Sequence, residues 1–200
     1  MIDRQSFVLA KDNMDYDAAL FKKQEPFVRL YTWQSPGLTY AYRQTLPHDL
    51  QTIDNSVRIT GGGIVFHCPG DLVFSIALML DGSFKACLQR IQAAVLKPLL
   101  LCQPHIQDTH ASSGDINRAY CAGYHSPYEL SVDHHKVFGI AAKKNKRHIC
   151  VQGILHLTPS NRYFGSLGDP YTSYFTQGMA CDCVDTLTLA LGQALEALGS

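Results

Sequence analysis

The chain has 200 residues, of which 46% are hydrophobic and 17% are charged, a balance typical of a globular protein and not of a disordered one. Its 17 basic and 17 acidic residues cancel, so bulk charge attracts neither nucleic acid nor an anionic membrane surface. The N-terminus has no export-signal pattern, and no apolar run reaches the roughly 18 residues of a membrane span. We therefore expect one cytoplasmic domain over residues 1–200.

Hydrophobic periodicity alternates between helix and strand patterns. A first helix is predicted to begin at Asp12 or Asn13 and to end before Pro26. A second helix is predicted from Phe84 and is expected to end at about Pro98. The other expected segments are strands at 27–33, 38–42, 72–80, 128–132, 136–142 and 149–157, a polar loop at 103–115, short helical pieces at 159–178, and a last helix at 184–198. This order predicts an α/β (α+β) fold in which helices flank a mixed β-sheet.

Seven cysteines, an odd number, occur in this chain. Without an export signal they are expected to be free thiols, either buried or used chemically. Cys181 and Cys183 form a C-x-C pair, but a convincing zinc site needs a second pair of ligands. No metal site is therefore predicted from the sequence.

The most informative stretch is 57–76, VRITGGGIVFHCPGDLVFSI. Three glycines at 61–63 separate two strand-like runs, so no Cβ prevents the backbone from approaching a ligand. His67 and Asp71 follow the second run. The glycines lack the Lys-Ser/Thr of a phosphate loop, and from composition alone a flexible hairpin is the simpler interpretation.

The string R-x-T-G-G-G-x-V-F-H-x-P-G-D-L favours a more specific interpretation. It resembles the signature loop of the lipoate-protein ligases and their octanoyltransferase relatives, which share a catalytic fold with biotin-protein ligases. The segments 128–132 and 136–141 are similar to the family's strand, turn and strand with its essential lysine. The likeness extends over most of residues 12–157. It implies a catalytic domain of the biotin/lipoate protein ligase type, and because members with a C-terminal accessory domain are longer, no such domain is expected here.

The resemblance also implies which residues act. Lys136 matches the family's lysine, which contacts the carbonyl or acyl phosphate of the activated acid, and a positive charge there stabilises the oxyanion of acyl transfer. From the residue alone, a surface lysine at a strand end is the simpler interpretation. Contact with the acyl group or acyl adenylate is expected from these matching positions: Trp33, Arg58, Thr60, Gly61, Gly62, Gly63, His67, Asp71, Gly139 and Ala141.

Cys121 lies shortly before the lysine-bearing hairpin. It resembles the cysteine with which one branch of the family forms a thioester acyl-enzyme. A thiolate suits thioester exchange when a neighbouring cation, here Lys136 or His125, stabilises it. A loop or core cysteine is the structural alternative. The sequence leaves open whether Cys121 and Lys136 are in contact.

The sequence departs from the family pattern at three places, and the last of them, at 152–154, makes nucleotide handling less secure because it removes a polar group from the expected substrate region. Val57-Arg58 replaces a paired arginine, Asp71 replaces an asparagine, and Gln152-Gly153-Ile154 replaces a His-Gly-Thr or His-Gly-Ser string. Separately, the turn at 143–147 is basic. It is either a solvated face or a docking patch for an acidic lipoyl domain.

We expect an enzyme that attaches a lipoyl or octanoyl group to a lysine of a lipoyl-carrying protein. The first expectation is an ATP-dependent ligase that works through an acyl adenylate, with lipoate or octanoate as acyl donor and possible use of ATP with Mg²⁺. The alternatives are an ATP-independent transferase using a Cys121 thioester, and a non-catalytic binder of lipoate or lipoyl domains. A biotin-protein ligase fits less well, because its glycine-loop arginine motif differs. The implied partners are lipoyl domains of 2-oxoacid dehydrogenases or a glycine-cleavage H-type carrier protein.

Overall fold

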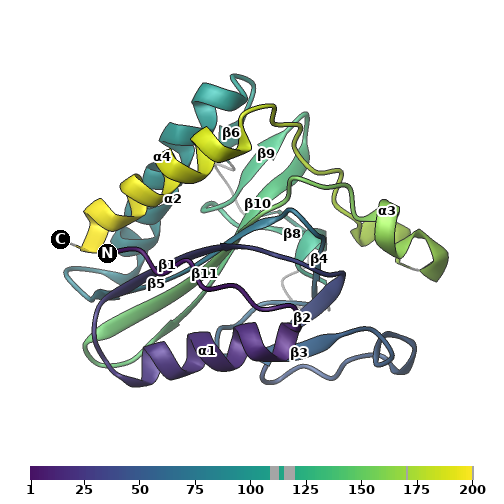
Figure 1. Ribbon diagram of the computed structural model, residues 1–200, viewed down its shortest axis with the longest axis horizontal. Helices are drawn as coiled ribbons and strands as arrows, with labels where there is room; N and C mark the ends of the chain where they lie inside the picture. Colours follow the sequence, from purple (N-terminus) through teal and green to yellow (C-terminus); the bar gives the residue numbers. More distant parts are fainter. Residues whose placement is uncertain (109–112, 115–119, 170, 200) are drawn as a thin grey trace.

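A six-stranded antiparallel sheet organises the molecule, and Figure 1 shows the helices around it. The computed structural model describes residues 1–108, 113–114, 120–169 and 171–199. The strands of this sheet lie in the order β1-β5-β11-β10-β9-β6. A smaller sheet has the order β3-β2-β4, and β7 pairs with β8. In the small sheet β2 runs parallel to β3 and antiparallel to β4.

The elements follow in chain order. They are α1 Ala10–Lys22, β1 Phe27–Thr32, β2 Gly37–Ala41, η1 His48–Leu50, β3 Asn55–Arg58, β4 Val65–His67, β5 Leu72–Met79, α2 Phe84–Cys102, β6 Gln107–Asp108, β7 Ser113–Gly114, η2 Cys121–Gly123, β8 Tyr124–His125, β9 Leu130–Val132, β10 His135–Lys144, β11 His148–Leu155, α3 Asn161–Phe164, η3 Gly165–Leu167, η4 Thr172–Tyr174 and α4 Val184–Gly199. None of the helices described here is long and apolar enough to cross a membrane.

The two faces of the large sheet are covered differently. Helices α2 and α4 lie side by side over one face (Figure 1), where they form the main apolar core with the sheet. Helix α1 packs on the opposite face beside Tyr31, Val73 and Ile154. Close packing of β11 on β5 requires Gly153, because a Cβ there would lie 2.3 Å from the Phe74 ring. The predicted α/β fold with flanking helices is confirmed.

The first helix begins earlier than the sequence predicts. It starts at Ala10, not at Asp12 or Asn13, because the Ala10 amide donates to a carboxylate oxygen of Asp54 at 2.7 Å. Asn13 lies inside the helix, where its side-chain amide donates to the carbonyl of Phe7 at 2.8 Å. The capping acceptor lies 44 residues further along the chain, so local sequence signals cannot reveal it.

The second helix continues beyond its expected end. Ser83 caps its first turn by accepting a hydrogen bond from the Ala86 amide at 3.1 Å, but Pro98 lies inside the helix, which ends at Cys102. The buried face that includes Val95 and Leu99 continues past the proline, and its packing offsets the one backbone hydrogen bond that proline removes. The expected loop at 103–115 contains β6 and β7, while 109–112 and 115 lie outside the described residues.

The other predicted strands and the last helix are confirmed to within two residues. The tail after residue 159 holds the expected short helical pieces, α3, η3 and η4. Sheet membership was harder to foresee. Although only residues 33–36 separate β1 from β2, they lie in different sheets, and β1 pairs with β5. The small sheet therefore places the glycine stretch beside the large sheet.

Candidate active site

Lys136 is buried at the start of β10, just before a register irregularity between β9 and β10. Its side chain is 5% exposed, and its ammonium nitrogen lies 2.6 Å from a carboxylate oxygen of Glu129. The same nitrogen donates to the carbonyls of Cys121 and Tyr124 at 3.0 and 3.1 Å, and lies 3.4 Å from the Cys121 sulfur. Lys136 is therefore not a surface lysine.

The charge of Lys136 follows from these contacts. Burial acts to lower its pKa, but the nearby Cys121 and Glu129 together outweigh burial and raise it. The side chain is accordingly an ammonium ion near neutral pH. Removing a partner would leave a buried charge uncompensated, which is expensive.

Cys121 begins the short helix η2 and connects the lysine to the glycine stretch. Its amide donates to the carbonyl of Ile64 at 2.9 Å, next to the bridge between Ile64 and Tyr120. The thiol is half-buried. The contact between Cys121 and Lys136 that the sequence left open is therefore present. His125 was the other cation expected beside the thiol, but burial first and Lys136 second lower its pKa, which favours its neutral form. Lys136 is the cation that contacts the Cys121 sulfur, and the charge of Arg58 also interacts with Cys121.

Three cavities meet at Cys121. The largest, about 710 Å³, is lined by the glycines at 61–63, Ala141 and Glu129 among others. A narrow recess of about 40 Å³ has mostly apolar walls that include Met14, Val73 and Ile154. A third, about 20 Å³, includes Lys136. One large cavity and two small recesses therefore have Cys121 in their walls.

Arg58 fixes the shape of the glycine stretch. Its guanidinium donates to the carbonyl of Gly61 at 2.7 Å and to that of Gly63 at 2.6 Å. Burial lowers its pKa to about 10, against the opposing effect of Cys121, so it remains charged at neutral pH. Gly62 between them has φ of 92°, and a Cβ there would lie 3.0 Å from Arg58. Arg58 thus holds the loop while glycine permits its bend.

Thr60 leads from the glycine stretch into a buried polar network. Its hydroxyl donates to the amide oxygen of Gln152 at 2.7 Å, and the Gln152 amide nitrogen donates to Asp17 at 2.7 Å. Asp17 in turn pairs with Arg29 at 2.5 Å, with both side chains fully buried. The glutamine that departs from the family pattern therefore joins the loop to α1 and β1.

Of three other expected residues, His67 lines the narrow recess, and Asp71 and Trp33 support the site from behind. Asp71 is buried, and its carboxylate accepts from the amides of Cys68 at 2.9 Å and Leu157 at 3.0 Å. Trp33 is fully buried and stacks on His67 with 4.0 Å between ring centroids. His67 lines the narrow apolar recess, and burial lowers its pKa well below the ordinary value. Asp71 and Trp33 lie one layer behind the cavity walls.

Of the remaining expected residues, Gly139 and Ala141 both line the narrow recess. The roles of all these residues stay predictions. Sequence reasoning assigned no role to Glu129 or Gln152. A signal for Glu129 was available, because a lysine buried beside an apolar strand needs an anionic partner. No comparable signal pointed to Gln152.

Comparisons with known proteins show the family to which the chain belongs. The family described as "Lipoyl protein ligase A/B catalytic domain" matches residues 10–196, and the chain belongs to this family. The octanoyltransferase LipM of Clostridioides difficile (strain 630) is 30% identical over 154 residues, which are 66% of this chain and 56% of that protein. The matched region thus spans little more than half of the curated relative.

Solved structures share the fold. A T. acidophilum protein, Ta0514, with bound lipoic acid superposes with a TM-score of 0.75 and 17% identity, over 98% of this chain and 84% of that chain. A lipoate-protein ligase A bound with ATP gives a TM-score of 0.73 and 19% identity, over 99% of this chain and 85% of that chain. The predicted resemblance to the lipoate-protein ligase and transferase family is therefore confirmed.

Proposed function

We propose that the protein is an ATP-independent acyltransferase that moves an octanoyl or lipoyl group from a carrier-bound thioester to a lysine of a lipoyl domain. The observation that carries the proposal is the 3.4 Å contact between the Lys136 ammonium and the Cys121 sulfur at the junction of three cavities. The curated relative described as an octanoyltransferase supports the same reaction class.

In the first half-reaction Cys121 is the nucleophile. Its thiolate attacks the thioester carbonyl of the donor, a carbon–sulfur bond to Cys121 forms, and the bond to the carrier sulfur breaks. The carrier leaves as a thiolate and the acyl group remains on Cys121. We expect the positive charge of Lys136 to stabilise both the attacking thiolate and the oxyanion of the tetrahedral intermediate.

In the second half-reaction the neutral ε-amine of the acceptor lysine attacks the Cys121 thioester. An amide bond forms, the bond to the Cys121 sulfur breaks, and the amine releases a proton. The Cys121 thiolate is regenerated beside Lys136. No energy from ATP is needed, because a thioester is already activated toward amines.

Ion pairing keeps Lys136 in place through both steps. Glu129 holds the ammonium at 2.6 Å, and the carbonyls of Cys121 and Tyr124 occupy two further directions. A lysine with its charge fixed before the reaction spends no free energy on reorganisation when the oxyanion develops. Glu129 is thus a positioning residue.

The narrow recess beside Cys121, of about 40 Å³, is proposed to receive the first carbons of the aliphatic tail, because it is smaller than an eight-carbon chain. Its walls include Val65, Val73, Ile140 and Ile154, with Met14 closing one side. Apolar walls favour an alkyl chain at about 25 cal/mol per Å² of area removed from water. Trp33 supports this wall from behind through its stack on His67.

A basic rim at the mouth of the large cavity suits an acidic partner. Lys143 lies 5.9 Å from the ring centre of Tyr42, and Lys144 lies 5.6 Å from that of Phe84. Both rings line the cavity, as does the exposed Arg43. We propose that an acidic lipoyl domain docks on this rim, which presents its target lysine to Cys121.

A second candidate is the ATP-dependent ligase that forms an acyl adenylate. It is favoured by the volume of the large cavity, about 710 Å³, and by the glycines along its wall. The charges of the cavity walls fit a triphosphate poorly, and Lys143 and Lys144 lie at the rim and not in the walls. Among the described residues that line this cavity Arg43 is the one basic side chain and Glu129, tied to Lys136, the one acidic side chain.

One experiment separates the two candidates. The protein is incubated with an acceptor lipoyl domain and either octanoyl-carrier protein without ATP, or lipoate or octanoate with ATP and Mg²⁺, and the acceptor is weighed intact. We expect modification from the thioester donor alone. Modification that requires ATP and survives Cys121→Ser would contradict the transferase and support the ligase. If neither mixture gave product while the protein still bound the acyl chain, the protein would be a non-catalytic binder.

A further inference from the structure

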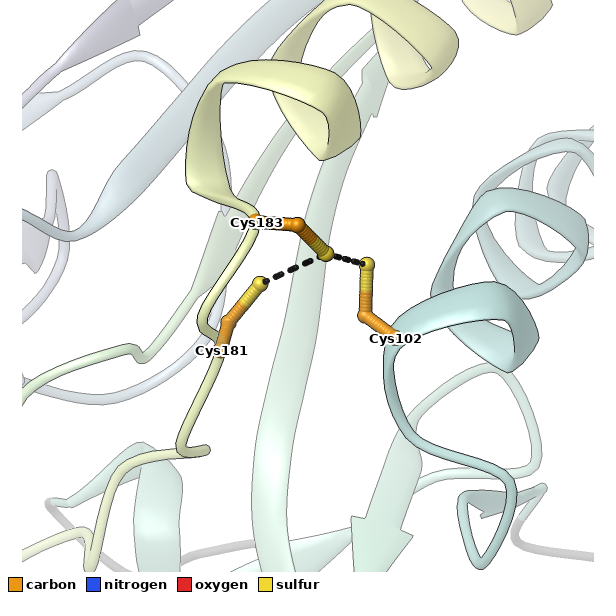
Figure 2. Close-up of side chains that lie close together, drawn as sticks. All are labelled: Cys102, Cys181 and Cys183. Carbon is orange, nitrogen blue, oxygen red and sulfur yellow. Dashed lines mark hydrogen bonds between the residues drawn. The ribbon is translucent and has the colours of Figure 1, made fainter.

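Three of the seven cysteines converge on one point away from Lys136 (Figure 2). Cys102 is the last residue of α2, and Cys181 and Cys183 lie on the segment that enters α4. The sulfurs of Cys102 and Cys183 lie 2.8 Å apart and those of Cys181 and Cys183 lie 3.8 Å apart. All three sulfurs lie within 4.8 Å of one another. We refer to these three residues as the thiol cluster.

The fold itself brings the thiol cluster together. Cys102 and Cys183 are 81 residues apart in the chain, and the packing of α2 against α4 closes that separation. The carbonyl of Cys183 accepts from the Leu187 amide at 2.9 Å, so Cys183 lies at the N-terminus of the 16-residue helix α4. A helix N-terminus stabilises negative charge on a thiolate.

The spacing of the sulfurs fits a shared ion. Because a Zn–S bond is about 2.3 Å, two sulfurs on one tetrahedral zinc lie about 3.8 Å apart. The separation of Cys181 from Cys183 has this value. The 2.8 Å contact of Cys102 with Cys183 is shorter, and an ion between them would need these two sulfurs to separate by about 1 Å.

A disulfide would involve only two of the three sulfurs in the thiol cluster. All three cysteines are free thiols and are partly exposed. A bond between Cys102 and Cys183 would leave Cys181 without a role and would need an oxidant. A soft d¹⁰ cation binds all three sulfurs at once, because thiolates are the ligands that such ions prefer. Among the described residues these three make up the whole ligand group, which leaves a fourth position for solvent.

We propose that Cys102, Cys181 and Cys183 form a zinc site that ties the end of α2 to the start of α4. The site does not depend on the proposed acyl transfer, because its ligands belong to other elements than Cys121 and Lys136. Because zinc would bind the assembled site and not the unfolded chain, its binding free energy would add to the stability of the folded state. We expect the apparent melting temperature to rise by roughly 5–10 °C when free zinc is a hundredfold above its Kd.

The test uses the full chain, reduced and freed of metal with a chelator. Zinc is titrated against a chromophoric competitor, and the product is weighed under native conditions. One zinc per chain is expected, and zinc should protect three cysteines, mapped as those of the thiol cluster, from alkylation. Replacing zinc with cobalt(II) should give thiolate-to-cobalt charge-transfer absorption.

Matched variants decide the location. Cys102→Ser and Cys181→Ser should each weaken zinc binding by about a hundredfold or more, whereas the control Cys121→Ser should bind zinc as the parent does. Circular dichroism of each metal-free variant shows whether it has folded, and the alkylation map of the parent tests the site without any substitution. Absence of zinc binding at micromolar concentrations, protection of other cysteines, or a preference for copper(I) with zinc excluded would overturn the proposal. A Cys102–Cys183 disulfide in protein purified under reducing conditions would also overturn it.

Discussion

Cysteine side chains with a proposed role lie in two regions of the molecule, and these regions differ in what surrounds the sulfur atoms. At the candidate active site a single thiol, Cys121, adjoins an ammonium ion at 3.4 Å and opens onto three cavities. In the thiol cluster three sulfurs adjoin one another where α2 meets α4. The first arrangement suits a nucleophile that must be free to react. The second suits ligands that share an ion.

The difference teaches that the neighbours of a cysteine, more than its burial, indicate its use. Cys121 and the members of the thiol cluster are all half-buried. A cation beside a lone thiol stabilises the anion that attacks a carbonyl, and a cavity admits the substrate. Where several thiols lie together without such a cation, they lose their protons when a metal ion binds the resulting thiolates. The following predictions test this distinction.

The largest effect is expected from Cys121→Ser. Acyl transfer from octanoyl-carrier protein should fall by at least about a thousandfold, because a serine hydroxyl is a poor nucleophile without a general base. Cys181→Ser in the thiol cluster should keep the parent rate at saturating acceptor. Initial rates followed by intact mass of the acceptor measure both. Equal losses in the two variants would erase the distinction between the regions.

Lys136→Met should lower kcat by about a hundred- to a thousandfold. The methionine keeps most of the buried volume but removes the charge that stabilises the oxyanion, a contribution of this general size. It also leaves Glu129 buried without its partner, so the thermal midpoint is measured alongside the rate. A variant that folds and keeps the parent kcat would show that the cation beside Cys121 has no part in the chemistry.

Glu129→Gln should have a smaller effect on the rate, about ten- to a hundredfold, through the position of Lys136. Breaking the buried pair should also lower the free energy of unfolding by about 3–5 kcal/mol, which chemical denaturation measures. Glu129→Asp serves as the control, because it keeps the charge and should recover part of both losses. If Glu129→Gln changed the stability alone, Glu129 would be structural only.

The smallest effect is expected at the basic rim. Reversing Lys143 and Lys144 to glutamate should lower kcat/KM for the lipoyl domain about tenfold at low salt and less at high salt, because rim charges act mainly on association. Transfer to a small amine acceptor should be unchanged. If kcat/KM did not depend on salt, or if it fell equally with the small acceptor, the rim would not be the docking surface.

The sequence predicted most of the fold because local signals determined most of the elements. Apolar runs and turn residues placed the strands and helices to within a few residues. The predictions failed where residues far away in the chain determine where a helix begins or ends. Asp54 sets the start of α1 from 44 residues away, and the continuing buried face carries α2 past Pro98.

The candidate site was predictable in its parts and not in its assembly. The glycine stretch, Lys136 and Cys121 follow from motifs, but their meeting depends on a bridge between Ile64 and Tyr120 and on a buried carboxylate at Glu129. The thiol cluster was hidden for the same reason. Only the C-x-C half is visible along the chain, and its third member comes from another helix.

The most direct test of the central claim is to trap the acyl group on the enzyme. The protein is mixed with octanoyl-carrier protein without acceptor or ATP, quenched in acid and weighed intact, and its peptides are mapped. We predict one octanoyl group per chain, attached to Cys121 and released by neutral hydroxylamine, as a thioester is. An unmodified enzyme that still transfers octanoate to the acceptor, or an octanoyl group on any other cysteine, would contradict the account.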